Sequence, residues 1–191
     1  MTSNHQWCRA WLITATLAAC WLLMLAVHEA GHVLHAWVSG GVVTRVVLHP
    51  LSLSRTGVDP DPHPVFQAAG GPLWGCLLPL AAWGVAAAVR WRYSFLPRFL
   101  AGFCLAANGA YLAVDAWTRG GDGRALVTDL TSACVVCGCG IAAVAAGLWT
   151  WHAQGRRFGL GHEADPPDSR AAAALSGLVA VIVLVEVLLA G

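Results

Sequence analysis

Five apolar stretches, each long enough to cross a lipid bilayer as a helix, constrain this chain more than any other feature. The hydrocarbon core of a bilayer is about 30 Å thick, and a helix needs about 20 apolar residues to cross it. Charged residues make up only 11% of the 191 residues, against about 25% in soluble proteins. The sequence therefore predicts one all-α integral membrane domain, residues 1–191, with about five transmembrane helices. The expected spans are residues 10–38, 72–89, 99–117, 125–151 and 171–190.

The segment between the first two spans, residues 40–71, has a different pattern. Residues 42–48 are rich in β-branched side chains and are bounded by glycines and Pro50, which is typical of a strand. Residues 51–56 alternate between apolar and polar side chains and could pair with that strand. We expect a small membrane-associated β-element here.

The distribution of charge bears on partners and topology. The net charge of +1 offers no basic surface for nucleic acid, so the lipid bilayer is the expected surrounding. The first span is longer than a signal-sequence core of about 7–15 residues and is expected to be retained. Arginines are more numerous in the loops on the side of the N-terminus, which predicts a cytoplasmic N-terminus. That side holds Arg9, Arg90, Arg92, Arg98, Arg156, Arg157 and Arg170, and the other holds Arg45, Arg55, Arg119 and Arg124.

Residues 28–32 read His-Glu-Ala-Gly-His, an HExxH motif inside the first span. Residues four apart lie on one face of a helix, about 6 Å from each other, so His28 and His32 could bind one zinc ion. Glu29 lies beside them and could take a proton from a water molecule that the metal activates. The motif also occurs by chance in helices that bind nothing. However, ionisable side chains in a span cost several kcal/mol unless they pair or bind a metal, and this favours zinc.

A catalytic zinc ion needs a third protein ligand. His35 lies roughly 10 Å along the helix from His28, too far to share its ion, and is expected to face a substrate channel or to end the helix in water. The first and third spans run in the same direction, so their C-terminal ends meet at one membrane face. Asp115 and Asp122 lie at that end of the third span, and geometry alone leaves both open. Asp129 and Glu186 are weaker candidates, and Glu186 is expected to face the interior of the bundle.

These residues resemble the site-2 protease family of zinc intramembrane metallopeptidases, especially its compact bacterial branch. The HEAGH motif, residues 28–32, carries most of the resemblance. Residues 69–72, Ala-Gly-Gly-Pro, look like the glycine-proline element that follows a β-rich loop in that family. Asn108, followed by Gly-Asp-Gly-Arg-Ala-Leu at residues 121–126, looks like its third motif, in which an Asp-Gly supplies the last zinc ligand.

The resemblance implies hydrolysis of a peptide bond in a membrane-spanning protein substrate, in a bacterial cell membrane. One zinc ion would be held by His28, His32 and Asp122, with Glu29 as general base and Asn108 in substrate binding. We also expect the strand at residues 42–48 to pair with the unwound substrate.

The sequence also departs from the family pattern. Asn108 and Asp122 are twice as far apart as in better-known members, no proline lies between them, and Asp115 occupies the usual spacing. Two other classes therefore stay open. One is a non-catalytic metal-binding membrane protein of the same fold, and the other is an ion-handling transporter with an intramembrane histidine and glutamate relay.

Overall fold

The computed structural model describes residues 3–50, 54–161 and 163–190. Among these residues, five helices are long and apolar enough to cross a membrane, as a multi-pass membrane protein requires. They are α1 (Ser3–Val38), α2 (Pro64–Ala88), α3 (Phe95–Thr118), α5 (Leu130–Trp151) and α6 (Ser169–Ala190).

All five helices begin at residues that differ from the sequence prediction, and α1, α3 and α6 start at Ser3, Phe95 and Ser169, ahead of the expected residues 10, 99 and 171. Helix α2 starts at Pro64, ahead of the expected residue 72, because a proline fits the first turn, where its missing N–H is not needed. Helix α5 starts at Leu130 and not at residue 125, because the Asp129 side chain accepts a hydrogen bond from the Ser132 amide and caps the helix there. The residues before this cap form a separate short helix, α4 (Gly123–Leu126).

The β-element is a two-stranded antiparallel hairpin of β1 (Val43–Val47) and β2 (Arg55–Val58). The first strand lies inside the predicted range. The second strand begins at Arg55, with Ser54 outside it, and ends at Val58, beyond the predicted end at residue 56. Of the predicted range 51–56, residues 51–53 lie outside the described residues.

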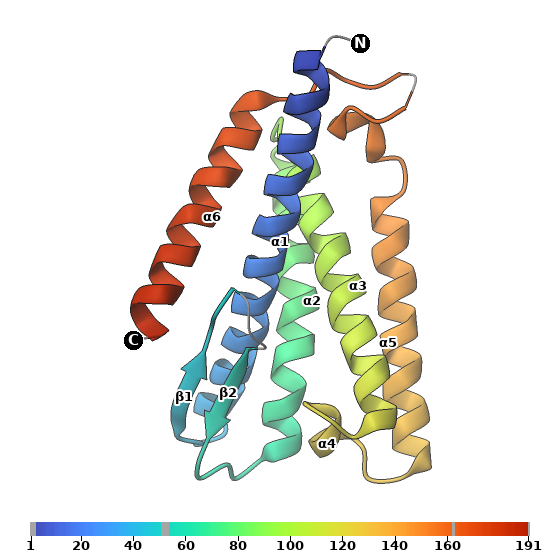
Figure 1. Cartoon of the computed structure of the whole chain (residues 1–191). Coiled ribbons are helices and arrows are strands. Elements are labelled where there is room, and N and C mark those ends of the chain that lie inside the picture. Colours follow the sequence, from blue (N-terminus) through green and yellow to red (C-terminus); the bar gives the residue numbers. More distant parts are fainter. Residues whose placement is uncertain (1–2, 51–53, 162, 191) are drawn as a thin grey trace.

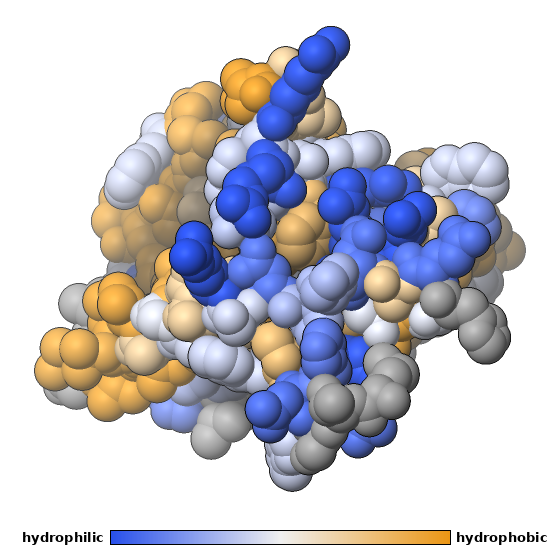
Figure 2. Space-filling view, turned by 90° about the horizontal axis from the view of Figure 1, so that it is seen from above, coloured by the Kyte–Doolittle hydropathy of each residue, from blue (hydrophilic) through white to orange (hydrophobic). Residues whose placement is uncertain are grey.

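The helices are arranged around α1 (Figure 1). Helix α6 packs on one side of α1, and α2, α3 and α5 follow one another on the other side. Helices α1 and α3 run in the same direction, so their C-terminal ends meet beside the hairpin and α4. Figure 2 looks onto the opposite end, where the N-terminus lies, and shows hydrophilic side chains gathered over that face.

Glycines allow α1 and α2 to approach each other closely near the motif. A Cβ atom added at Gly31 of α1 would collide with the backbone carbonyl of Gly70 on α2, and one added at Gly70 would collide with that of Gly31. Small residues at such a crossing let two helix backbones come into contact. This contact brings the backbone of α2 against the histidine side chains of α1.

Candidate metal centre

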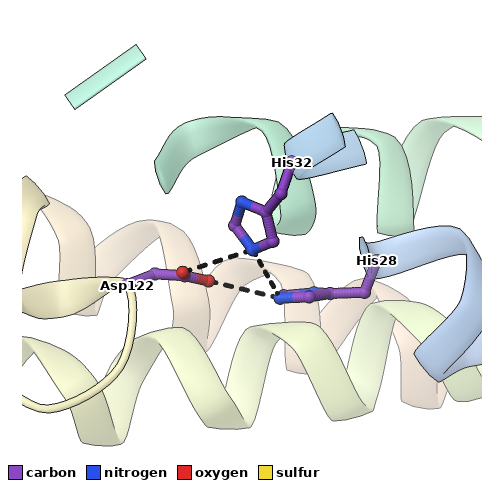
Figure 3. A group of neighbouring side chains, drawn as sticks. All are labelled: His28, His32 and Asp122. Carbon is purple, nitrogen blue, oxygen red and sulfur yellow. Dashed lines mark hydrogen bonds and ion pairs between the residues drawn. The ribbon is translucent and has the colours of Figure 1, made fainter. Parts of the chain in front are cut away.

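His28 and His32 of α1 meet Asp122 from the loop between α3 and α4 (Figure 3). Their Nε2 atoms lie 3.1 Å apart, and each is 3.3 Å from an oxygen of the Asp122 carboxylate. Both histidines are buried, and the Asp122 side chain is 14% exposed. The potential ligand atoms all lie within 4.8 Å of one another, so the three residues could hold a metal ion.

The other ring nitrogen of each histidine contacts an oxygen that can only accept a hydrogen bond. Nδ1 of His28 lies 2.6 Å from Oδ1 of Asn108, whose Nδ2 donates to the Cys104 carbonyl. Nδ1 of His32 lies 2.9 Å from the backbone carbonyl of Gln67. Both Nδ1 atoms must therefore carry the proton and donate it, which leaves the Nε2 lone pairs directed at the cluster.

The cluster thus consists of three electron-pair donors with no hydrogen-bond donor between them. Two nitrogen lone pairs at 3.1 Å repel each other unless a proton or a cation lies among them. Two imidazoles and a carboxylate are ligands common to zinc and other divalent transition metals. The donor set therefore fits a metal ion.

Asp122 is held in its ionised form by its surroundings. Burial raises the pKa of its carboxyl, but without a metal ion the protonated forms of His28 and His32 donate to its two oxygens and lower the pKa by more, to about 2. The carboxylate is therefore negatively charged at neutral pH, as a metal ligand must be.

Asp115 lies outside this group and contacts the loop that carries Asp122. Gly121 packs against the Tyr111 hydroxyl and the Asp115 carboxylate so closely that an added Cβ would overlap both, and Gly123 packs against the Asp115 backbone. Asp115 is buried, with 6% of its surface exposed. Of the two aspartates that geometry left open, the structure brings Asp122 to the histidines and places Asp115 behind its loop.

The backbone of Gly71 on α2 forms one wall of the cluster. A Cβ atom at this position would overlap Nε2 of His32 and would lie 2.6 Å from Nε2 of His28. Any larger residue would fill the space in front of the two nitrogens. Glycine at position 71 therefore keeps the centre open.

Glu29 and the three possible ligands line one cavity of about 1140 Å³. This is slightly larger than typical small-molecule sites, which measure about 300–1,000 Å³. Ser54, Arg55 and Thr56 of the hairpin also line it, whereas strand β1 does not. The Glu29 carboxylate accepts a hydrogen bond of 2.6 Å from the Thr56 hydroxyl.

His35 takes a different place from the one expected. It is buried between α1 and α2, its Nδ1 is 2.6 Å from the Phe66 carbonyl, and its Nε2 accepts from the Trp74 indole at 3.2 Å. It neither lines the cavity nor ends the helix in water, because α2 begins early enough to cover it.

The remaining candidate ligands lie away from the centre. Asp129 caps α5 through Ser132. Glu186 is buried on α6, as expected for a residue that faces the bundle, and is not part of the metal-ligand group.

Asn108 was predicted to bind substrate. It lines the cavity, but its side chain is engaged with His28 and with its own helix. The contacts of Gln67 and Thr56 with the motif were missed. The first is made by a backbone carbonyl, which no side chain in the sequence signals, and the second depends on the register of the hairpin.

Comparisons with known proteins identify no family model, no curated protein and no solved structure that matches this chain.

Proposed function

We propose that the chain is a zinc-dependent intramembrane endopeptidase that hydrolyses a peptide bond in a membrane-spanning protein. One observation carries this proposal. A glutamate next in sequence to a His-His-Asp cluster shares a large cavity with that cluster, among helices apolar enough to span a bilayer. This combination is what a hydrolytic zinc site requires: three protein ligands, space for substrate and water, and an adjacent base.

The separation of the ligand atoms favours zinc. Two atoms that are each about 2.05 Å from a tetrahedral ion lie about 3.3 Å apart. The Nε2 atoms of His28 and His32 lie 3.1 Å apart, and each lies 3.3 Å from a different oxygen of Asp122, so each of these three distances is close to that value. Three protein ligands would leave one position open for water, as in catalytic zinc sites.

Each residue then has a defined role. When bound, zinc lowers the pKa of a water molecule to around 7 and polarises the carbonyl of the scissile peptide bond. The Glu29 carboxylate accepts a proton from that water and delivers it to the leaving amine nitrogen. Asn108 keeps the proton of His28 on Nδ1, and the Gln67 carbonyl does the same for His32, so that both Nε2 atoms stay available.

Strand β2 of the hairpin is the proposed binding surface for substrate. A transmembrane helix must unwind before its peptide bonds become accessible, and an unwound segment can add to the edge of a sheet. Strand β2 lies along the cavity, so its outer edge is better placed for this pairing than β1, which the sequence favoured.

The arginine bias supports insertion in a cell membrane with a cytoplasmic N-terminus. The face seen in Figure 2 would then be the cytoplasmic one. The hairpin and the metal centre lie toward the opposite end of the bundle, where α1 and α3 finish.

The test is cleavage of labelled transmembrane peptides in liposomes that contain the purified protein. Zinc-loaded wild type should cleave at least one peptide, chelation should abolish cleavage, and added zinc should restore it. Glu29→Gln should keep its zinc and lose cleavage by about 100-fold or more. Equal cleavage by Glu29→Gln, or no cleavage by zinc-loaded wild type across a set of varied transmembrane peptides, would contradict the proposal.

A further inference from the structure

The side chain of Thr56 connects the hairpin to the HExxH motif. Its hydroxyl donates to Oε2 of Glu29 over 2.6 Å. Hydrogen bonds from a hydroxyl to an ionised carboxylate are typically about 2.5–2.7 Å long, shorter and stronger than those between neutral groups. Glu29 is only 3% exposed, so this contact is made away from bulk water.

We propose that Thr56 is a positioning residue that holds the Glu29 carboxylate in its working orientation. The inference rests on the proposed peptidase function and adds to it a role for one residue of strand β2. Glu29 acts on the reacting atoms, and Thr56 acts through Glu29.

The chemistry of the two side chains explains why a contact of this kind is needed. A glutamate side chain has three rotatable bonds and can place its carboxylate in several orientations. Threonine is β-branched and has a restricted χ1 angle, so a strand presents its hydroxyl in a nearly fixed direction. With Oε2 held by Thr56, Oε1 is the oxygen left to accept a proton in the cavity.

The hairpin register sets the direction of the Thr56 side chain. Thr56 pairs with Val46 of β1, and side chains alternate between the two faces of a strand. Arg55 and Thr56 both line the cavity, so a peptide bound along β2 would lie next to the residue that orients the base. Substrate binding and orientation of Glu29 therefore depend on the same strand.

Three zinc-loaded variants test the role of the hydroxyl. Thr56→Val replaces the hydroxyl with a methyl group of similar size, and Thr56→Ser retains the hydroxyl. Thr44→Val is the control, because it makes the same threonine-to-valine change at an exposed residue of the hairpin that does not line the cavity. We expect Thr56→Val to lower kcat about 10- to 100-fold with KM within about twofold of wild type. Thr56→Ser should recover kcat to within about threefold, and Thr44→Val should match wild type. All three should bind the same amount of zinc.

A second measurement requires no catalysis. Amide hydrogen exchange of β2 should be about tenfold faster in Glu29→Ala and in Thr56→Val, because each removes one partner of the hydrogen bond. Glu29→Gln retains an acceptor oxygen and should exchange like wild type. The double variant Glu29→Ala, Thr56→Val should exchange no faster than either single variant, since both remove the same interaction.

The two measurements separate this inference from the proposed function. If wild type cleaves and fully zinc-loaded Thr56→Val cleaves equally well, the positioning role is wrong while the peptidase proposal stands. If wild type cleaves no peptide, the proposed function fails, and non-additive exchange then supports the Thr56–Glu29 link by itself. If the exchange rates of β2 stay unchanged in the single variants, or if the effects of Glu29→Ala and Thr56→Val add up in the double variant, the link between Thr56 and Glu29 is wrong.

Discussion

Oδ1 of Asn108 lies 2.6 Å from Nδ1 of His28, and this contact decides which nitrogen of His28 faces Asp122. Exchanging the positions of the oxygen and nitrogen of the Asn108 amide would break a second hydrogen bond, because Nδ2 donates to the Cys104 carbonyl one turn earlier on α3. The amide oxygen must therefore accept from His28, and the Nε2 lone pair is directed at the cluster. Asn108 of α3 thus orients His28 of α1 so that its Nε2 atom can bind a metal ion.

Replacing Asn108 should weaken zinc binding although Asn108 touches no metal. Asn108→Leu removes the acceptor that orients His28, and we expect the zinc affinity to fall about 10- to 100-fold, the range found for residues that orient histidine ligands. Asn108→Asp keeps an acceptor oxygen and should stay within about threefold of wild type. Competition titration with a chromophoric chelator measures the difference. Equal affinities in the two variants would show that the contact does not orient His28.

Adding one methyl group at Gly71 should remove metal binding. In Gly71→Ala the new Cβ overlaps Nε2 of His32 and lies 2.6 Å from Nε2 of His28, in front of both lone pairs. Gly84→Ala is the matched control, because a Cβ at this position of the same helix meets nothing within 4 Å. We expect Gly84→Ala to bind zinc like wild type and Gly71→Ala to bind none, as measured by zinc content after purification. Full zinc occupancy in a folded Gly71→Ala variant would exclude the site.

The two candidate aspartates should behave differently when each is changed to asparagine. Asp122→Asn removes the charge of a direct ligand, so zinc should be lost on purification. Asp115→Asn alters only the support of the Gly121–Gly123 turn, so affinity should fall by about tenfold while saturating zinc still fills the site. Loss of zinc in Asp115→Asn with retention in Asp122→Asn would reverse the assignment.

Acid should loosen the start of helix α5. The hydrogen bond from the Ser132 backbone amide lowers the pKa of Asp129 in the folded chain. A carboxyl with a lowered folded-state pKa stabilises the fold when ionised, so this contribution is complete above the ordinary value of 3.8 and is lost as the pH falls below it. Amide exchange protection over the first turn of α5 should therefore decrease below about pH 4 relative to the centre of the helix. In Asp129→Asn, whose neutral side chain still caps the helix, the protection of this turn should not change with pH over the same range.

The sequence was sufficient for the helices and for the histidine pair because both depend on local patterns. A run of about twenty apolar residues predicts a span. Because His28 and His32 are four residues apart, they lie on one face of the helix. The start of α5 was predicted too early, because residues 125–127, Ala-Leu-Val, are apolar enough to extend the span, while the Asp129 cap acts through one side chain. The prediction for His35 was wrong because the surroundings of this residue depend on where α2 begins.

The third ligand was harder to predict because it depends on packing between distant segments. Asp115 and Asp122 both lie near the end of α3, and spacing alone does not say which reaches α1. The turn of Gly121 over Tyr111 and Asp115 decides this, since it carries Asp122 toward the histidines. The contact between Thr56 and Glu29 likewise depends on the hairpin register, which the alternating pattern left undetermined.

The zinc content of the detergent-purified protein tests the central claim most directly. Wild type should contain close to one zinc ion per chain, Glu29→Gln should contain the same amount because Glu29 is not a ligand, and Asp122→Asn should contain almost none. Folded wild type that takes up no zinc when supplied with it, and without chelator, would contradict the metal centre and the peptidase proposal built on it.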